Sequence, residues 1–142
     1  MTDPAARGDR VKLFTLAEAN RLIPEVRPLL QELSECKSSL ALVQGALVEM
    51  TPQMRGNGHR LEALGLEKQL ESLIDRIAQG IQQIELMGIE LKDIDSGLID
   101  FPSIYRGRIV YLCWRLGEET IEYWHEITTG FSGRRPVSEL DG

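Results

Sequence analysis

The sequence has the size and composition of a single soluble domain: 142 residues, 42% hydrophobic and 27% charged, with a formal net charge of −6. Its longest uninterrupted apolar stretch, Ile109 to Trp114, is far too short to cross a membrane, and the first dozen residues lack the apolar core of a signal peptide. Lysine and arginine are scattered, which gives no basic patch for a phosphate backbone. We therefore expect a cytoplasmic protein with neither a membrane nor a nucleic acid as partner.

A long helix is predicted from residue 16 to residue 50. Residues 1–13 lack periodicity and are expected to form a disordered terminus. Thr15 and Glu18 fit a capping box, in which each side chain accepts a hydrogen bond from the other residue's backbone N–H. Pro24 and Pro28 lie inside the helical pattern and predict a bend or a restart near residue 24. The apolar residues recur in alternating steps of four and three, the heptad spacing of a helix packed on another helix: Leu22, Val26, Leu29, Leu33, Cys36, Leu40, Val43, Leu47 and Met50.

A second helix is predicted from residue 61 to residue 91. Proline and glycine residues between Thr51 and Arg60 mark the tip that joins the two helices, and so short a connection requires an antiparallel hairpin over residues 14–91. Gly88 and Glu67 interrupt the apolar pattern of the second helix. Its apolar row consists of Leu70, Ile74, Ile77, Ile81, Ile84 and Leu91, and is widened on one side by Leu66, Leu73 and Met87.

A small lobe of mixed composition is predicted over residues 92–136, followed by a short tail at 137–142. Seven of the eight aromatic residues lie between Phe101 and Phe131. Residues 98–101 and 109–116 are predicted to form a two-stranded β-hairpin, with Pro102 and Gly107 in its turn and Asp100 facing Arg115. Residues 118–128 have the composition of a short helix. The predicted fold class is thus mainly α with a small α+β lobe in one domain.

A divalent metal site is one candidate function for this lobe. If residues 118–128 are helical, Glu122 and His125 share one face, and an ExxH pair is a known metal-ligand spacing. Carboxylates nearby could complete the site, which gives the candidate ligands Asp95, Asp100, Glu118, Glu122 and His125. The simpler alternative is a structural histidine that bonds a neighbouring carboxylate.

The other motifs of the lobe are less specific. Two glycines precede Arg134 and Arg135, an arrangement that can hold a phosphate or a carboxylate, although it can equally be an exposed turn. Cys36 and Cys113 lie within apolar patterns and are expected to be reduced, buried and unreactive. No serine or cysteine nucleophile is recognisable beside a histidine, so covalent catalysis is not predicted.

The hairpin is expected to need a partner surface. Two helices that pack only on each other bury little apolar area relative to the chain entropy lost on folding. Either the lobe covers them, or a second copy of the chain covers the widened row of the second helix. We expect a homodimer in which two hairpins form a four-helix arrangement.

Several motifs resemble an uncharacterised bacterial family, domain of unknown function 2203. The similar segments are residues 14–20 (FTLAEAN), 92–102 (KDIDSGLIDFP), 112–118 (LCWRLGE), 123–126 (YWHE) and 130–134 (GFSGR). The resemblance spans about residues 13 to 136 and implies a cytoplasmic bacterial protein, without an activity or a ligand to transfer. Two hypotheses follow from the sequence: a self-associating interaction module, or a small metal-binding protein or metal-dependent enzyme with its site in the lobe.

Overall fold

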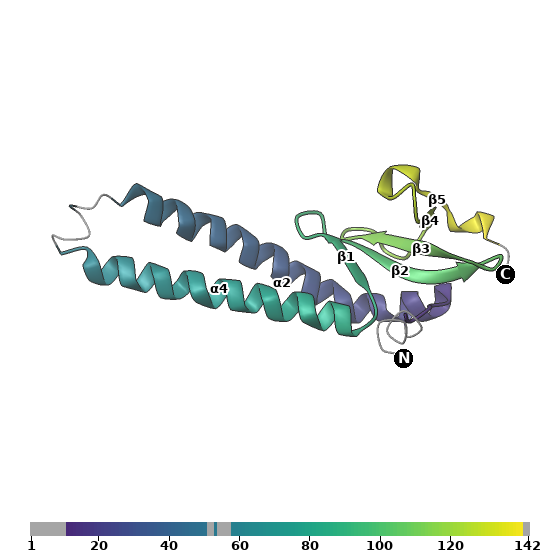
Figure 1. Ribbon diagram of the computed structural model, residues 1–142, viewed down its shortest axis with the longest axis horizontal. Helices are drawn as coiled ribbons and strands as arrows, with labels where there is room; N and C mark the ends of the chain where they lie inside the picture. The colour runs from purple at the N-terminus through teal and green to yellow at the C-terminus, as the bar shows by residue number, and fades with distance from the viewer. Residues whose placement is uncertain (1–10, 51–52, 54–57, 141–142) are drawn as a thin grey trace, which may run out of the picture.

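A helical hairpin extends from one end of an antiparallel sheet (Figure 1). The computed structural model describes residues 11–50, 53 and 58–140. The hairpin consists of α2 (Leu16–Glu49) and α4 (Arg60–Leu86). Most of the predicted disordered terminus, most of the predicted tip and the last two residues of the tail lie outside the described residues. Five strands and two short 3₁₀ helices follow: β1 (Glu90–Asp93), β2 (Leu98–Tyr105), β3 (Arg108–Arg115), β4 (Tyr123–Glu126), η1 (Phe131–Gly133), β5 (Arg135–Pro136) and η2 (Val137–Glu139).

The start of α2 confirms the predicted capping box. Thr15 Oγ1 accepts a hydrogen bond from the Glu18 backbone N–H at 3.1 Å, and Glu18 Oε1 accepts one from the Thr15 N–H at 2.9 Å. The predicted restart near residue 24 is wrong, because α2 is continuous through Pro24 and Pro28. Each proline removes one helical hydrogen bond, but the neighbouring apolar side chains of this segment are buried in the main core and hold the helix there.

The second helix ends earlier than predicted. Met87 caps α4, and Gly88 has a φ of 89°, a left-handed conformation that ends helices and favours glycine. The apolar residues beyond it therefore do not continue the helical row. Ile89 is buried in the main core, and Leu91 belongs to β1. Leu91 keeps the helical spacing although it belongs to the first strand, and the predicted helix was therefore too long.

The lobe contains a five-stranded antiparallel meander with the order β1-β2-β3-β4-β5, rather than the two-stranded hairpin predicted. The predicted helix over residues 118–128 is wrong, because Tyr123–Glu126 pairs with β3 as β4. The turn between β2 and β3 is Arg106-Gly107, with φ values of 51° and 78°, which match a type I′ hairpin turn. Pro102 lies within β2, beyond the end of the β1 pairing, and its carbonyl accepts a bond from Phe14 N.

Side-chain alternation separates the two faces of the sheet. The inner face packs on the hairpin through Ile99, Phe101, Leu112, Trp114 and Trp124, which share one core with residues of α2 and α4. Phe14, just before α2, meets Phe101 edge to face at 5.2 Å. Among the described residues no helix is long and apolar enough to cross a membrane. Because its inner face shares a core with α2 and α4, the sheet covers one end of the hairpin and leaves its own outer face for other contacts.

Candidate functional site

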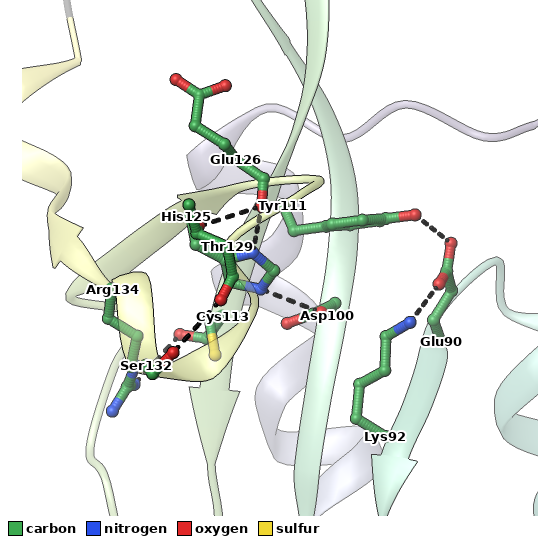
Figure 2. Close-up of polar contacts among 10 residues, drawn as sticks. All are labelled: Glu90, Lys92, Asp100, Tyr111, Cys113, His125, Glu126, Thr129, Ser132 and Arg134. Atoms are coloured by element: carbon green, nitrogen blue, oxygen red, sulfur yellow. Dashed lines mark hydrogen bonds and ion pairs between the residues drawn. The ribbon is translucent and has the colours of Figure 1, made fainter.

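Polar side chains gather on the outer face of the sheet, opposite the hairpin. In the register of the sheet, Asp100 on β2 is paired with Cys113 on β3, and Tyr111 on β3 is paired with His125 on β4. Cross-strand partners lie on the same face, and residues two apart along a strand do so as well. Three adjacent strands thus bring Asp100, Cys113 and His125 together, as Figure 2 shows. The register also corrects the predicted pairing of Asp100 with Arg115, since Arg115 is paired with Leu98.

Asp100 and His125 form a buried pair. His125 Nε2 lies 3.0 Å from Asp100 Oδ2, and each side chain is 3% exposed. The other ring nitrogen, Nδ1, lies 2.7 Å from the backbone carbonyl of Glu126. A carbonyl oxygen can only accept, so Nδ1 carries a proton, and Nε2 carries one too when it faces an ionised carboxylate. An imidazolium paired with a carboxylate fits both of these contacts.

The surroundings of His125 favour its charged form. Burial by itself lowers the pKa of the imidazole, but the hydrogen bonds to Asp100 and to the Glu126 carbonyl, together with the charge of Asp100, outweigh it and raise the pKa above its ordinary value. The ammonium of Lys92 opposes this rise. The other groups that face the pair are the thiol of Cys113 and the ring of Tyr111.

The stability of the metal-free protein should fall as the pH rises above neutrality. The folded state holds the His125 proton more tightly than the unfolded state does, so this stabilisation is complete below the unfolded pKa, near 6.5. It is lost as the pH rises through the higher folded pKa. Urea unfolding of chelator-treated protein between pH 5 and 9 measures it. His59→Gln, a change at an exposed histidine, should leave the profile unchanged, and a His125→Gln variant with the same decline would contradict the assignment.

Cys113 completes a cluster of three potential metal-ligand atoms. Its Sγ, one oxygen of Asp100 and one ring nitrogen of His125 all lie within 4.8 Å of one another, and all three residues are buried. Burial, reinforced by the charge of Asp100, raises the pKa of the thiol to about 12. The thiol is therefore protonated at neutral pH, which agrees with the expectation that Cys113 is no nucleophile.

A small cavity of about 200 Å³ lies beside the cluster. Tyr111 Oη donates a hydrogen bond to Glu90 at 2.8 Å, and Lys92 Nζ donates one to the same carboxylate at 2.8 Å. Burial, followed by the bond to Glu90, raises the pKa of Tyr111 to about 12. The cavity thus has charged groups of both signs, Lys92 and Asp100, beside apolar walls. Its lining consists of Lys92, Leu98, Asp100, Tyr111, His125, Ile127, Gly130 and Phe131.

The structure brings together two of the five residues predicted as metal ligands, Asp100 and His125. Glu122 is exposed just before β4; residues three apart share a face of a helix but not of a strand, so the predicted ExxH geometry does not exist. Asp95 forms an exposed ion pair with Lys37 at 2.9 Å. The alternative interpretation, a histidine bonded to a carboxylate, describes the observed pair as it stands.

Glu118, a further predicted ligand, is used by Arg134. The Arg134 Nη2 lies 2.8 Å from both oxygens of Glu118, and the guanidinium stacks on Tyr123 with its carbon 4.1 Å from the ring centroid. Arg135, the second residue predicted to bind an anion, pairs with Glu139 at 2.7 Å. Both guanidinium groups have carboxylate partners, which does not favour an anion site at this turn.

Sequence reasoning missed Cys113 as a potential ligand. Its apolar neighbours predicted a small buried residue, and the buried, free thiol confirms that much. Whether a buried thiol meets a carboxylate and an imidazole depends on the register of three strands, and β4 was predicted to be a helix. The available signal was the pair Tyr123 and Trp124, because aromatic residues favour a strand.

The far half of the hairpin is the second notable surface. Among the described residues, its core contains three buried side chains, Cys36, Val43 and Leu73. Several apolar residues packed against them are only partly buried: Leu40, Leu47, Leu66, Leu70 and Ile77. Ile74, within this region of α4, is 50% exposed. This part of the hairpin lies beyond the sheet (Figure 1), so no other described element covers it.

Comparison with known proteins agrees with the resemblance found in the sequence. Residues 12–137 match the model of a family described as "Uncharacterized conserved protein (DUF2203)". The chain belongs to this family. No curated protein and no solved structure matches the chain. Family membership therefore confirms the resemblance without adding an activity, and a function must be argued from the residues of this chain.

Proposed function

We propose that the hairpin is an interaction arm through which two copies of the chain associate. The observation that carries the proposal is Ile74, which is 50% exposed in the middle of α4 while its neighbours along the helix contribute to a core. Isolated exposed apolar residues are ordinary on protein surfaces, but a row of them along one side of a helix indicates a contact surface.

Ile74 is the exposed member of a row of apolar residues whose other members are partly buried. Leu70, Ile74, Ile77 and Ile81 follow one another in steps of four, three and four, and therefore lie along one side of α4. Ile77 packs against both the main core and the small core of the far half. Ile81 also packs against the main core, so the row links the two cores, and Ile74 is its exposed member.

A second copy is the partner that best fits this surface. The residues beside the row carry both signs of charge, and Glu32 already pairs with Arg76 across the two helices at 3.2 Å. Charges of both signs on one face suit a self-complementary interface, because a two-fold axis places each patch against its own copy. Two hairpins paired in this way form a four-helix arrangement, in which each amphipathic helix buries its apolar side.

Replacing Ile74 with glutamate should convert the dimer to a monomer. The carboxylate would be desolvated at the proposed interface, whereas in the monomer it is solvated. Sedimentation at micromolar concentration measures the mass. Leu42→Glu is the matched control, because Leu42 is a 76% exposed apolar residue outside the row, on α2, and its replacement should leave the dimer intact.

Leu73 and Met87, which widen the predicted apolar row, are less suitable positions for this experiment. Leu73 is buried between the helices and Met87 packs on the main core, so glutamate at either position would unfold the chain rather than report on association. A wild-type protein that remains monomeric at micromolar concentration, or an Ile74→Glu variant as dimeric as Leu42→Glu, would refute the proposal.

A further inference from the structure

We propose that Asp100, Cys113 and His125 bind a zinc ion on the outer face of the sheet. Each residue offers one ligand atom, and the three atoms lie within 4.8 Å of one another. This inference is independent of the hairpin and of its association. Its donor set shares Asp100 and His125 with the ligands predicted from the sequence, and Cys113 is new.

The three donors are held by the most regular part of the lobe. Asp100 and Cys113 are direct cross-strand partners, and His125 is paired with Tyr111, two residues from Cys113. Their backbones are fixed by the hydrogen bonds of β2, β3 and β4. A site built on paired strands is formed before the ion arrives, which lowers the cost of binding.

An unsatisfied oxygen is the second observation that indicates a ligand. Asp100 is 2% exposed, and its Oδ1 has no hydrogen-bond partner among the described residues. Buried carboxylate oxygens are nearly always bonded, because a desolvated oxygen without a partner is costly. A cation at the cluster would interact with this carboxylate and compensate that cost.

His125 has the orientation of a metal-binding histidine. Its Nδ1–H donates to the Glu126 carbonyl at 2.7 Å, so the ring is fixed and Nε2 is the nitrogen directed at Asp100. Zinc-bound histidines commonly donate their other N–H to a backbone carbonyl or a carboxylate, which sets the tautomer and the ring orientation. In this arrangement a cation takes the place of the proton between Nε2 and Oδ2.

The distances require only small movements. Zinc bonds of about 2.0 to 2.1 Å to nitrogen and oxygen at a tetrahedral angle place these two ligand atoms roughly 3.3 Å apart. The observed separation of Nε2 and Oδ2 is 3.0 Å. A zinc–sulfur bond of about 2.3 Å requires roughly 3.5 Å between sulfur and nitrogen. The present upper limit of 4.8 Å therefore calls for a shift of at most about 1.3 Å, within reach of a change in the Cys113 side chain.

The chemistry of the donors selects the ion. Thiolate and imidazole suit zinc, whereas calcium and magnesium prefer oxygen ligands alone. On binding, the Cys113 thiol and the His125 imidazolium each release one proton to solvent. The bound set is then Zn²⁺ with two anionic ligands and one neutral ligand, which is neutral overall and suits a buried position.

Three protein ligands leave a fourth tetrahedral position for a water molecule. Asp100 and His125 also line the cavity of about 200 Å³, so this position has space beside it. Structural zinc sites are usually closed by four protein ligands, and sites that keep an open position are the ones that bind exogenous ligands. The site is therefore of the open type.

Titration with cobalt(II) tests the site directly. Reduced, chelator-treated full-length protein should bind one equivalent of Co²⁺ with a thiolate-to-cobalt charge-transfer absorbance, and Zn²⁺ should displace it. Cys113→Ser should abolish that absorbance, and His125→Gln should weaken binding by about tenfold or more. Cys36→Ser is the matched control, because Cys36 is also a free buried cysteine but lies in the hairpin, and it should bind cobalt like the wild type.

X-ray absorption of the zinc-loaded wild type does not depend on any variant folding. A sulfur neighbour at about 2.3 Å supports the site. Cobalt binding without thiolate absorbance, an unchanged spectrum in Cys113→Ser, or the absence of saturable binding would each overturn it.

Discussion

Replacing His125 with alanine is expected to destabilise the metal-free protein by about 3 to 5 kcal/mol. The change leaves the Asp100 carboxylate buried without its charged partner, and its second oxygen already lacks a hydrogen bond. It also removes the hydrogen bond from His125 Nδ1 to the backbone carbonyl of Glu126 at the end of β4. Chemical denaturation at pH 6, below the ordinary pKa of histidine, measures the difference.

A double-mutant cycle separates the pair from its surroundings. Asp100→Ala together with His125→Ala removes both charges, so the double variant should lose at least about 1 kcal/mol less than the sum of the two single losses. His59→Ala is the control, because that histidine is exposed and its pair with Glu62 is worth little. Additive losses in the cycle would show that Asp100 and His125 do not form a coupled pair.

Replacing Trp114 with alanine should cost about 3 to 5 kcal/mol as well, through a different mechanism. The indole is fully buried between the sheet and the hairpin, and its Nε1–H donates to the Glu118 carbonyl at 3.0 Å. Removing it leaves a cavity where the strands meet α2. The midpoint of thermal unfolding should fall by roughly 10 °C or more.

Two conservative variants test the role of the indole hydrogen bond. Trp114→Phe loses the bond to Glu118, whereas Trp124→Phe removes an indole N–H that is buried without a partner. We therefore expect Trp124→Phe to lower the free energy of unfolding by less than Trp114→Phe does, because it removes no hydrogen bond seen among the described residues. The opposite order, or a Trp114→Ala variant as stable as the wild type, would contradict the described core.

The helices were predictable because their signals are local. The capping box at Thr15 and Glu18 and the steps of four and three that follow depend on neighbours within one or two turns, and α2 begins and ends within one residue of its prediction. Gly88 marks the end of α4, but the prediction extended the helix past it because Leu91 keeps the helical spacing. Leu91 belongs to β1, whose partner β2 lies further along the chain.

The strands were only partly predictable because their pairing is not local. β3 was predicted from its apolar run, displaced by one residue, whereas β4 was predicted as part of a helix from the composition of residues 118–128. The pairing of β4 with β3 overrides that weak preference, since backbone bonds and the burial of Trp124 favour the strand. Asp100 and His125 were both candidates, Asp100 as a nearby carboxylate and His125 through a helical spacing with Glu122 that the structure does not contain.

What the sequence determined by itself was the helical hairpin, an aromatic lobe that follows it and five candidate ligands, among them Asp100 and His125. Only the tertiary structure decided which atoms meet. The register of β2, β3 and β4 places Asp100, Cys113 and His125 within 4.8 Å, and directs Glu118 to Arg134 and Asp95 to Lys37 instead. The physical reason is that a helix is specified by interactions within a few residues. A sheet is specified by contacts between distant segments, and a register shift of one residue would turn these side chains to the opposite face.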